Sequence, residues 1–455
     1  MTKRMSIRVF LSIEIMIIVL LFLENSVFTN IPIVVFISFL INAGVFSGII
    51  INSISKHKFS FGFIHSFYML FMLTLAPMIQ LGTTGTFLSY KASNLKIVFV
   101  NFIILIWTVV FCWGRNSIKE LPSARNSHNT GNYVQIPMYI EYLMTFLMIV
   151  LAVNRIRTSG FSFFRNSSAQ TNFTGTGLSV ILFAIRISIV MVSVSLSIYR
   201  YKYSKKITIF LILNLILCLI IAFPTAIPRF LAATIYGGII LMLFDGLKKN
   251  YLYPIGIIVG FIIVFPMLSS FRYESDNINL LDLLRHVVLN IKNEYNTGNY
   301  DGYMMLARTI DYVDDKHITF GYSLIGNILF FIPRSIWPSK PVGSGAFIAE
   351  YSNLSFTNAS ESLIAESYLN FGIIGIFIYA YILGKLTKKQ DLIYWNNSNN
   401  IFVQLTYTFY IHIFLILLRG DFMTGFLYIS ILTIVFYCFY KVFRLKKQPK
   451  PVEDL

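Results

Sequence analysis

The chain contains a succession of apolar segments, each long enough to cross a lipid bilayer. A membrane-spanning helix needs about 17–25 predominantly apolar residues. Segments of this kind occupy residues 9–27, 31–51, 60–81, 96–114, 136–153, 176–198, 207–223, 229–247, 252–270, 367–384, 400–418 and 423–440. The sequence therefore predicts an all-α polytopic membrane protein with about twelve transmembrane helices.

The composition agrees with this prediction. Of the 455 residues, 56% are hydrophobic and only 13% are charged, and the mean hydropathy is +0.69. A soluble domain of this length does not have such a composition. The N-terminus has a basic start but no small-residue cleavage site, so residues 9–27 are expected to be a retained helix rather than a signal peptide. The three cysteines lie in apolar runs and offer neither a disulfide framework nor metal-ligand spacing.

The positive charges predict an orientation in the membrane. The formal net charge is +17. With a cytoplasmic N-terminus, 22 of the 37 Lys and Arg residues fall in cytoplasmic segments, 14 fall outside, and one lies within a helix. Cytoplasmic loops of membrane proteins carry such an excess. We therefore expect both termini in the cytoplasm, and we interpret the charge as membrane orientation rather than nucleic-acid binding.

One long loop interrupts the pattern between the ninth and tenth predicted helices. Residues 271–366 hold 11 of the 20 acidic residues and seven basic ones, which gives this loop a formal charge of −4. Long loops in compact proteins are usually functional. The chain is thus divided into helices one to nine (1–270), an extracytoplasmic loop (271–366), and helices ten to twelve with a basic cytoplasmic tail (367–455).

The loop contains helical patterns of its own. The apolar spacing in residues 277–295 predicts a helix that lies on the membrane or roofs a cavity. Residues 301–313 form a second helical pattern, with Asp301 as a candidate N-cap. Residues 322–332 are too short to span and predict a re-entrant or interfacial helix that the following prolines stop.

A proline-rich cationic segment, FFIPRSIWPSKP, follows at residues 330–341. Proline fixes the backbone φ angle and removes a donor, so Arg334 and Lys340 stand on a stiffened chain. Arg229 also follows a proline at the end of an apolar run, and Arg272 lies near the same membrane face. Rigid backbone around a cation favours a positioned anion site. The alternatives are interfacial anchoring or ion pairs with the acids of the loop.

Two further sets of charged residues have both structural and functional interpretations. Arg186 lies well within an apolar segment, where a charge is costly and suggests function, unless Arg186 pairs with Glu141 or Glu14. Near helix ten, Glu361 follows Asn358 by three residues, which is the spacing of a capping box. Glu366 has no such role and is therefore a candidate base near the outer membrane surface.

Common catalytic motifs are missing from the sequence. It contains no Walker A motif, no HExxH, no CxxC and no GxSxG. The acidic run DYVDDK (311–316) is interpreted as a solvated surface rather than a metal site. What remains is a membrane cavity with external cations and a carboxylate. Such a cavity suits a lipid-linked anion, such as a diphosphate, and a hydroxyl that needs deprotonation.

The same segments carry a resemblance to a known family. ITFGYSLIGNILFFIPRSIWPSKPVGSGAFIAE (318–350) and ESLIAESYLNFGIIG (361–375) resemble the oligosaccharide repeat unit polymerases, or O-antigen polymerases of the Wzy type. The resemblance implies a GT-C-type glycosyltransferase of the bacterial inner membrane that uses no metal or other cofactor. It would polymerise undecaprenyl-diphosphate-linked repeat units, as donor and acceptor, into a surface polysaccharide such as the O-antigen of lipopolysaccharide.

On this basis the candidate residues receive expected roles. Glu366 is the expected base for the acceptor hydroxyl, and Arg334 is expected to stabilise the departing diphosphate. Further candidates for binding the diphosphate or the glycan are Arg229, Arg272, Lys340, Arg186, Trp337 and Glu361. Membrane lipids and a chain-length regulator protein are candidate partners.

Three other functions remain open from the sequence. An O-antigen ligase would have a similar helix number, loop position and lipid donor. A flippase for lipid-linked oligosaccharides would be expected to show two equal halves or inverted repeats. An acyltransferase would be expected to place a histidine base in a helix, for which His65 and His412 are weak candidates.

Overall fold

A computed structural model describes residues 31–119, 133–134, 137–160, 177–268, 294–397, 400–442 and 447–448. The described chain is nearly all helical, and eight of its helices are long and apolar enough to cross a membrane. The protein is therefore a multi-pass membrane protein of the all-α class, as predicted. The predicted first helix, residues 9–27, lies outside the described residues.

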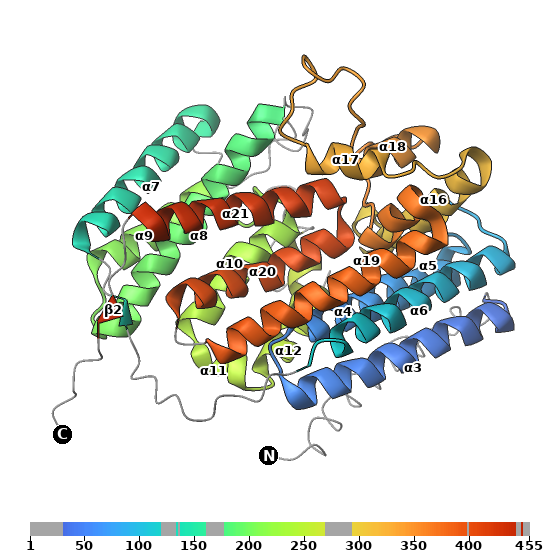
Figure 1. Ribbon diagram of the computed structural model, residues 1–455, viewed down its shortest axis with the longest axis horizontal. Coiled ribbons are helices and arrows are strands. Elements are labelled where there is room, and N and C mark those ends of the chain that lie inside the picture. Colours follow the sequence, from blue (N-terminus) through green and yellow to red (C-terminus); the bar gives the residue numbers. More distant parts are fainter. Residues whose placement is uncertain are drawn as a thin grey trace.

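The described helices coincide with the other eleven predicted segments (Figure 1). Eight are long: α3 (Ile33–Lys56), the continuous run of α4 (Phe61–Leu70), π-helical η1 (Phe71–Leu75) and α5 (Ala76–Thr84), α6 (Asn94–Asn116), α7 (Met138–Ser159), α8 (Gly177–Ser204), α19 (Leu363–Asn396), α20 (Ile401–Arg419) and α21 (Phe422–Val442). Three are shorter: α9 (Ile209–Ile221), α10 (Arg229–Leu243), and α12 (Leu252–Val259), which continues through π-helical η4 (Gly260–Val264) to Leu268. Two short strands, β1 (Tyr133–Val134) and β2 (Lys447–Gln448), pair antiparallel.

The helices pack around two apolar clusters that meet at α20. One cluster lies among α3, α4, α5, α6 and α19, and the other lies mainly among α7, α8, α9, α10 and α21. Figure 1 shows the first group on the right and α7, α8 and α9 on the left. Helix α20 joins them because Tyr407 and Ile411 enter the first cluster, whereas Phe409 and Ile413 enter the second.

Glycines let α6 and α19 touch backbone to backbone. A Cβ atom added to Gly114 would lie 2.3 Å from the Tyr381 carbonyl oxygen, and one added to Gly384 would lie 2.2 Å from that of Phe111. Lipid provides no hydrophobic force between helices, so close contact through small residues is a main source of helix association in membranes. The α6–α19 contact therefore fixes the position of α19, which carries Glu366.

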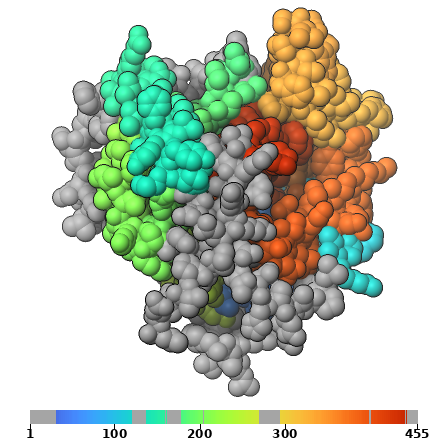
Figure 2. Space-filling model, turned by 60° about the vertical axis from the view of Figure 1, so that its left-hand side comes forward, coloured from blue at the N-terminus to red at the C-terminus, as the bar shows by residue number. Residues whose placement is uncertain are grey.

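The long loop gathers at one end of the helix bundle, which we call the loop end. Here lie the 3₁₀ turn η5 (Gly298–Tyr300), α16 (Gly302–Lys316), α17 (Tyr322–Ile328) and α18 (Ser344–Tyr351). Figure 1 shows α16, α17 and α18 together beyond α19 and α21, and Figure 2 shows the amber part of the loop as a raised lobe. Helix α11 (Asp245–Lys249) lies at the opposite end.

The structure changes several predictions for the loop. Helix α16 confirms the second predicted helix, but the Asp301 side chain does not cap it; its carboxylate accepts the Ser360 N–H and pairs with Arg419. The predicted helix 322–332 ends at Ile328, before the prolines. Helix α18 was not predicted, and the predicted helix 277–295 falls almost entirely outside the described residues.

Helix α19 is longer than the predicted segment 367–384. It begins at Leu363, and the Ser362 hydroxyl caps it by accepting the Ala365 N–H at 3.3 Å. The predicted capping box of Asn358 and Glu361 is therefore wrong, because the residue directly before the helix supplies the cap. At its other end α19 continues to Asn396, through residues that were expected to lie in a loop.

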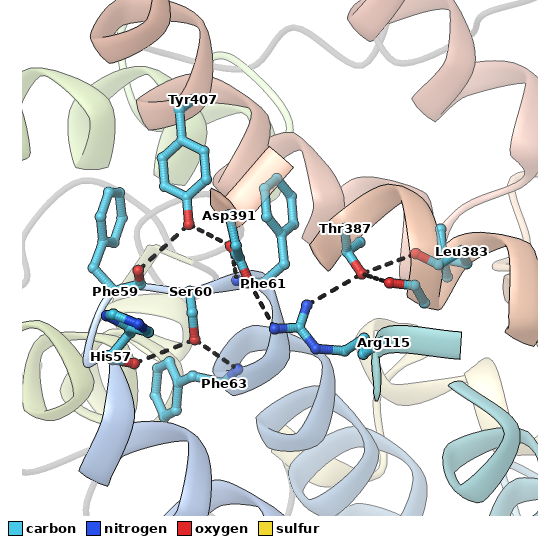
Figure 3. A network of polar contacts seen from close by, with 11 residues as sticks. His57, Phe59, Ser60, Phe61, Phe63, Arg115, Leu383, Thr387, Asp391 and Tyr407 are labelled. Atoms are coloured by element: carbon cyan, nitrogen blue, oxygen red, sulfur yellow. Dashed lines mark hydrogen bonds and ion pairs between the residues drawn. The ribbon is translucent and has the colours of Figure 1, made fainter. Parts of the chain in front are cut away.

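A buried polar network holds α19 at the end opposite the loop end (Figure 3). The Asp391 carboxylate of α19 pairs with Arg115 of α6 at 2.7 Å. It also accepts the Phe61 N–H at the start of α4 (3.1 Å) and the Tyr407 hydroxyl of α20 (2.5 Å). Arg115 also donates to the Thr387 hydroxyl at 3.3 Å. One carboxylate thus connects four helices.

We predict that Asp391→Asn destabilises the protein by about 3 kcal/mol, because it leaves the Arg115 guanidinium unpaired in a largely buried position. This is the low end of the range for a broken buried pair, since Arg115 remains 17% exposed. Equilibrium unfolding in mixed micelles, followed by circular dichroism, measures the change. Asp314→Asn is the control: this carboxyl is 61% exposed and its partner Lys96 keeps an ion pair with Asp311, so its loss should cost about 0.5 kcal/mol or less. Equal effects of the two substitutions would contradict the role given to Asp391.

Candidate functional site

The Glu366 carboxylate is the centre of the candidate site. Glu366 lies in the first turn of α19 and is fully buried. One carboxylate oxygen accepts the Ser344 hydroxyl of α18 at 2.5 Å and the Phe422 N–H of α21 at 3.2 Å. The other accepts the Ser323 hydroxyl of α17 at 3.5 Å and the Asn327 side-chain amide, also on α17. None of these contacts is with a cation, so hydrogen bonds alone satisfy the carboxylate.

A break in α19 separates the segment that carries Glu366 from the rest of the helix. Gly372 has φ 59° and ψ −142°, a conformation that glycine adopts far more readily than other residues. Before this break, the Asn370 side chain accepts the Leu324 N–H at 3.2 Å and the Thr319 hydroxyl at 3.0 Å. Residues 363–371 therefore form a separate helical segment, fixed to the segment that leads into α17.

A second buried carboxyl, Glu361, lies beside the first. One of its oxygens accepts the Thr309 hydroxyl of α16 at 2.6 Å, and the other has no hydrogen-bond partner among the described residues. Burial raises the pKa of Glu361 well above its ordinary value, and the nearby acids Glu366, Asp421 and Asp301 raise this pKa further. Glu361 therefore keeps its proton to a higher pH than an ordinary glutamate, and it is not a helix cap.

Asp421 completes this group of acids from the junction between α20 and α21. Its carboxylate accepts the Thr424 hydroxyl at 2.5 Å and the Thr424 N–H at 3.2 Å. Burial raises the pKa of Asp421, whereas these hydrogen bonds oppose the increase. A Cβ atom added to Gly343 would lie 2.5 Å from this carboxylate, so the residue before α18 must be small. Among the described residues, no group of three or more His, Cys, Asp or Glu side chains has the arrangement of a metal site.

The proline-rich cationic segment links α17 to α18, two of the three helices that donate hydrogen bonds to Glu366. We call residues 329–343 the cationic loop. The Arg334 guanidinium donates to the carbonyls of Lys340 (2.7 Å) and Pro341 (3.4 Å). The Lys340 ammonium donates to the carbonyls of Phe330 (2.6 Å) and Ile332 (3.1 Å). The two cations thus brace the loop from within, in addition to the prolines.

The cationic loop carries two positive charges and packs against α17. Partial burial lowers the pKa of Lys340, and the charge of the exposed Arg334 lowers this pKa further. A Cβ atom added to Gly326 would lie 2.2 Å from the Pro341 ring, so the loop rests directly on α17. Trp337 donates its indole N–H to the Ser339 hydroxyl at 3.1 Å, and its ring meets that of Tyr322 edge-on at 6.1 Å. The loop therefore holds two fixed cations above α17.

Arg229 has its partners close by, at the start of α10. It is 8% exposed and donates to the Phe265 carbonyl at 3.0 Å and to the Glu294 carboxylate at 3.2 Å. This is the ion pair with a loop acid that the sequence left open as an alternative to an anion site. The neighbouring Arg419 of α20 pairs with Asp301 at 3.4 Å. Both arginines connect the helix bundle to the long loop.

Two further predicted residues are not placed near Glu366. Arg272 lies outside the described residues. Arg186 lies in α8, in the cluster of helices on the other side of α20, with its guanidinium 4.8 Å from the Phe183 ring centroid. Arg186 does not pair with Glu141, because Glu141 pairs with Arg200 at 2.8 Å, and Glu14 is outside the described residues.

Sequence reasoning missed several residues that surround Glu366. Ser344, Asp421 and the Phe422 N–H reach the carboxylate or its neighbours from distant segments, and no local pattern indicates them. Asn327 had a weak signal in the sequence. It follows Ser323 by four residues, so the two side chains share one helix face.

Comparison with known proteins identified no relative. No protein-family model, no curated protein and no solved structure matches the chain.

We predict that Glu361→Gln makes the protein more stable than the wild type at pH 8, and that the difference shrinks toward pH 4.5. The folded protein holds the Glu361 proton at pH values where the unfolded chain, with an ordinary pKa of 4.5, has lost it. Stability therefore falls as the pH rises above 4.5, and glutamine removes this loss. Unfolding temperatures measured across this pH range test the prediction.

Glu350→Gln is the control, because Glu350 is exposed in the same loop and should show no such dependence. A Glu361→Gln variant less stable than the wild type at pH 8 would contradict a protonated Glu361.

Proposed function

We propose that the protein is a bacterial inner-membrane glycosyltransferase that polymerises undecaprenyl-diphosphate-linked oligosaccharide repeat units. One observation carries the proposal: α17 and α18, which flank the cationic loop, both donate hydrogen bonds to the buried Glu366 carboxylate. A candidate base and a pair of candidate diphosphate ligands thus belong to one unit. The segments that form this unit are those that resemble the O-antigen polymerases.

The proposed reaction needs these two kinds of group. The acceptor sugar hydroxyl attacks the anomeric carbon of the donor sugar, and the bond from this carbon to the diphosphate oxygen breaks. The electron pair of that bond leaves with the undecaprenyl diphosphate, and the hydroxyl proton passes to Glu366. Fixed positive charge near the leaving diphosphate lowers the barrier, and a base makes the hydroxyl a better nucleophile. Glu366 is the proposed base, and Arg334 with Lys340 would receive the diphosphate.

The internal contacts of the two cations are compatible with this role. A guanidinium has five N–H donors and an ammonium has three. Arg334 and Lys340 each use two carbonyl contacts to brace the loop, and further donors remain for a phosphate. Arg334 is exposed, so a ligand can reach its guanidinium directly. The carbonyl contacts therefore orient the cations without using all of their donors.

The burial of Glu366 sets a requirement for the acceptor. Two of the four groups that donate to its carboxylate are the hydroxyls of Ser323 and Ser344. An acceptor sugar hydroxyl can replace one of them without leaving the carboxylate unsatisfied. Because Ser344 is the first residue of α18, a small displacement of the cationic loop and α18 would open this position. We propose this exchange of hydroxyls as the step that brings the acceptor to the base.

The proposed orientation places the loop end in the periplasm and both termini in the cytoplasm. The distribution of basic residues between the two ends of the helices supports this orientation. The end opposite the loop end holds Lys56, Arg115, Lys202, Lys249 and Lys388 among others. Positive charge accumulates on the cytoplasmic side of membrane proteins. The candidate site would then meet lipid-linked glycans on the periplasmic side.

The orientation predicts which engineered cysteines a membrane-impermeant thiol reagent reaches. In a background without Cys112, Cys218 and Cys438, Ser355→Cys should be labelled on intact spheroplasts, since Ser355 is exposed at the loop end. The matched Lys249→Cys, exposed at the opposite end, should be labelled only after the membrane is opened. The reverse pattern would overturn the orientation.

For Glu366 we predict that Glu366→Gln elongates lipid-linked repeats at least about 100-fold more slowly than the wild type. Glutamine keeps the shape and accepts hydrogen bonds but cannot take the proton, and base catalysis typically contributes about 10²–10⁴-fold. Binding of the repeat unit should remain close to normal. Elongation and binding are measured separately on purified protein.

Glu350→Gln, which removes an exposed carboxylate from the same loop, should elongate at the wild-type rate. Near-wild-type elongation by Glu366→Gln would remove the base assignment and leave Glu366 as a structural hydrogen-bond acceptor.

For Arg334 we predict that Arg334→Lys loses elongation nearly as completely as Arg334→Ala. An ammonium is a point charge, so it cannot bridge two carbonyls in a fixed plane and still present a fork to a phosphate. Both variants should reach the membrane in normal amount, and Lys316→Ala, which removes an exposed cation from α16, should remain active. Full elongation by Arg334→Lys would reduce the requirement to positive charge alone.

A further inference from the structure

Two arginines lie on the adjacent helices α7 and α8, in the half of each helix nearer the loop end. Arg155 of α7 is 5% exposed, and Arg186 of α8 is half-buried. Helix α8 packs against both α7 and α21, and the Arg186 charge interacts with the Arg155 charge and with Tyr428 of α21. The two positive charges and the hydroxyl therefore belong to the helices of the second apolar cluster, against which Phe330 of the cationic loop also packs.

Within the described part of the chain, the two arginines lack the partners that a buried guanidinium normally has. Neither guanidinium makes an ion pair or a hydrogen bond there, and the Nε atom of each is buried without a partner. The Phe183 ring contacts Arg186 but neutralises no charge. Glu141, also on α7, is engaged with Arg200. Two like charges in a low-dielectric region repel each other, so this arrangement calls for an anion.

The position of the pair fits a ligand that comes from the lipid. Arg155 lies four residues from the end of α7, Arg186 nine residues into α8, and Tyr428 six residues into α21. These positions correspond to depths of about 6, 14 and 9 Å from the loop end of each helix. Leu182, one turn before Arg186, is 56% exposed, and Figure 2 shows α7 as an outer ridge of the molecule. The pair thus lies beside the lipid-facing surface, in the half nearer the loop end.

We propose that Arg155 and Arg186, with Tyr428, form a binding site for the phosphate or diphosphate headgroup of a membrane lipid. Planar guanidinium groups bind phosphate oxygens through paired hydrogen bonds. The negative charge of the phosphate would offset the two positive charges of the arginines. The Tyr428 hydroxyl would donate a further hydrogen bond. None of the three side chains is among the groups that donate to Glu366, and the inference does not depend on the proposed polymerisation.

The test measures lipid binding by the full-length protein, purified in a non-ionic detergent, with native mass spectrometry and thermal stabilisation. The probes are phosphatidylglycerol, undecaprenyl diphosphate, inorganic diphosphate, and a neutral diacylglycerol as the lipid without phosphate. The variants are Arg186→Gln and Arg155→Gln. Arg157→Gln is the matched control, since Arg157 is an exposed arginine only two residues further along α7.

We expect Arg186→Gln and Arg155→Gln each to weaken binding of the phosphate-bearing lipids about tenfold relative to Arg157→Gln, through loss of charge-assisted hydrogen bonds. Diacylglycerol should bind equally to all variants. A selective loss for undecaprenyl diphosphate identifies a polyprenyl carrier as the ligand, and an equal loss for phosphatidylglycerol identifies a general lipid phosphate site. Competition by inorganic diphosphate shows that the headgroup alone is recognised.

Equal affinities of Arg186→Gln and Arg157→Gln for every phosphate-bearing lipid would overturn the proposal. If Arg155→Gln does not fold, Arg186→Gln decides alone, because Arg186 is half-buried and its loss leaves no cavity in the core. A variant that changes the unfolding temperature of the lipid-free protein but not lipid affinity would show that the pair has only a structural role.

Discussion

The Glu366 carboxylate is the contact on which the arrangement of the loop end depends. It accepts hydrogen bonds from α17, α18 and the start of α21 while it belongs to α19. Helices as short as α17 and α18, with seven and eight residues, have little stability on their own. Because no described cation contacts this buried carboxylate, it must keep its hydrogen-bond donors, and so it fixes where these helices lie. The cationic loop between them is oriented by the same contact.

The two ends of the helix bundle are held together by different kinds of polar contact. At one end Asp391 holds α4, α6, α19 and α20 through an ion pair and neutral donors. At the loop end Glu361, Glu366 and Asp421 meet hydroxyl, amide and backbone donors, and the nearby Asp301 pairs with Arg419. Between these ends, the glycine contacts of α6 and α19 fix the helix axis. Helix α19 is thus held firmly as far as the break at Gly372, and the short segment before this break presents Glu366 at the loop end.

Much of the fold could be predicted from the sequence, because the physical cause is local. Apolar length marked the membrane helices, and proline marked the cationic loop. The polar contacts could not be predicted in this way, because they join residues far apart in the chain. Arg419 pairs with a residue 118 positions away, and Arg115 pairs with one 276 positions away. The spacing of Asn358 and Glu361 was misleading because Ser362, closer to the helix, supplies the cap. Glu366 was identified as the candidate base only because no local structural role, such as helix capping, accounted for its carboxylate.

The central claim is that this site joins lipid-linked repeat units to one another. The most direct measurement supplies the purified protein in liposomes with a single undecaprenyl-diphosphate-linked repeat unit, isolated from a strain that lacks the gene, and analyses the products by gel. The account predicts a ladder of two, three and more repeats, with one undecaprenyl diphosphate released for each new bond. Repeats that stay unextended until a lipid A core is added would indicate a ligase. Repeats that only cross the bilayer would indicate a flippase, and either result would contradict the account.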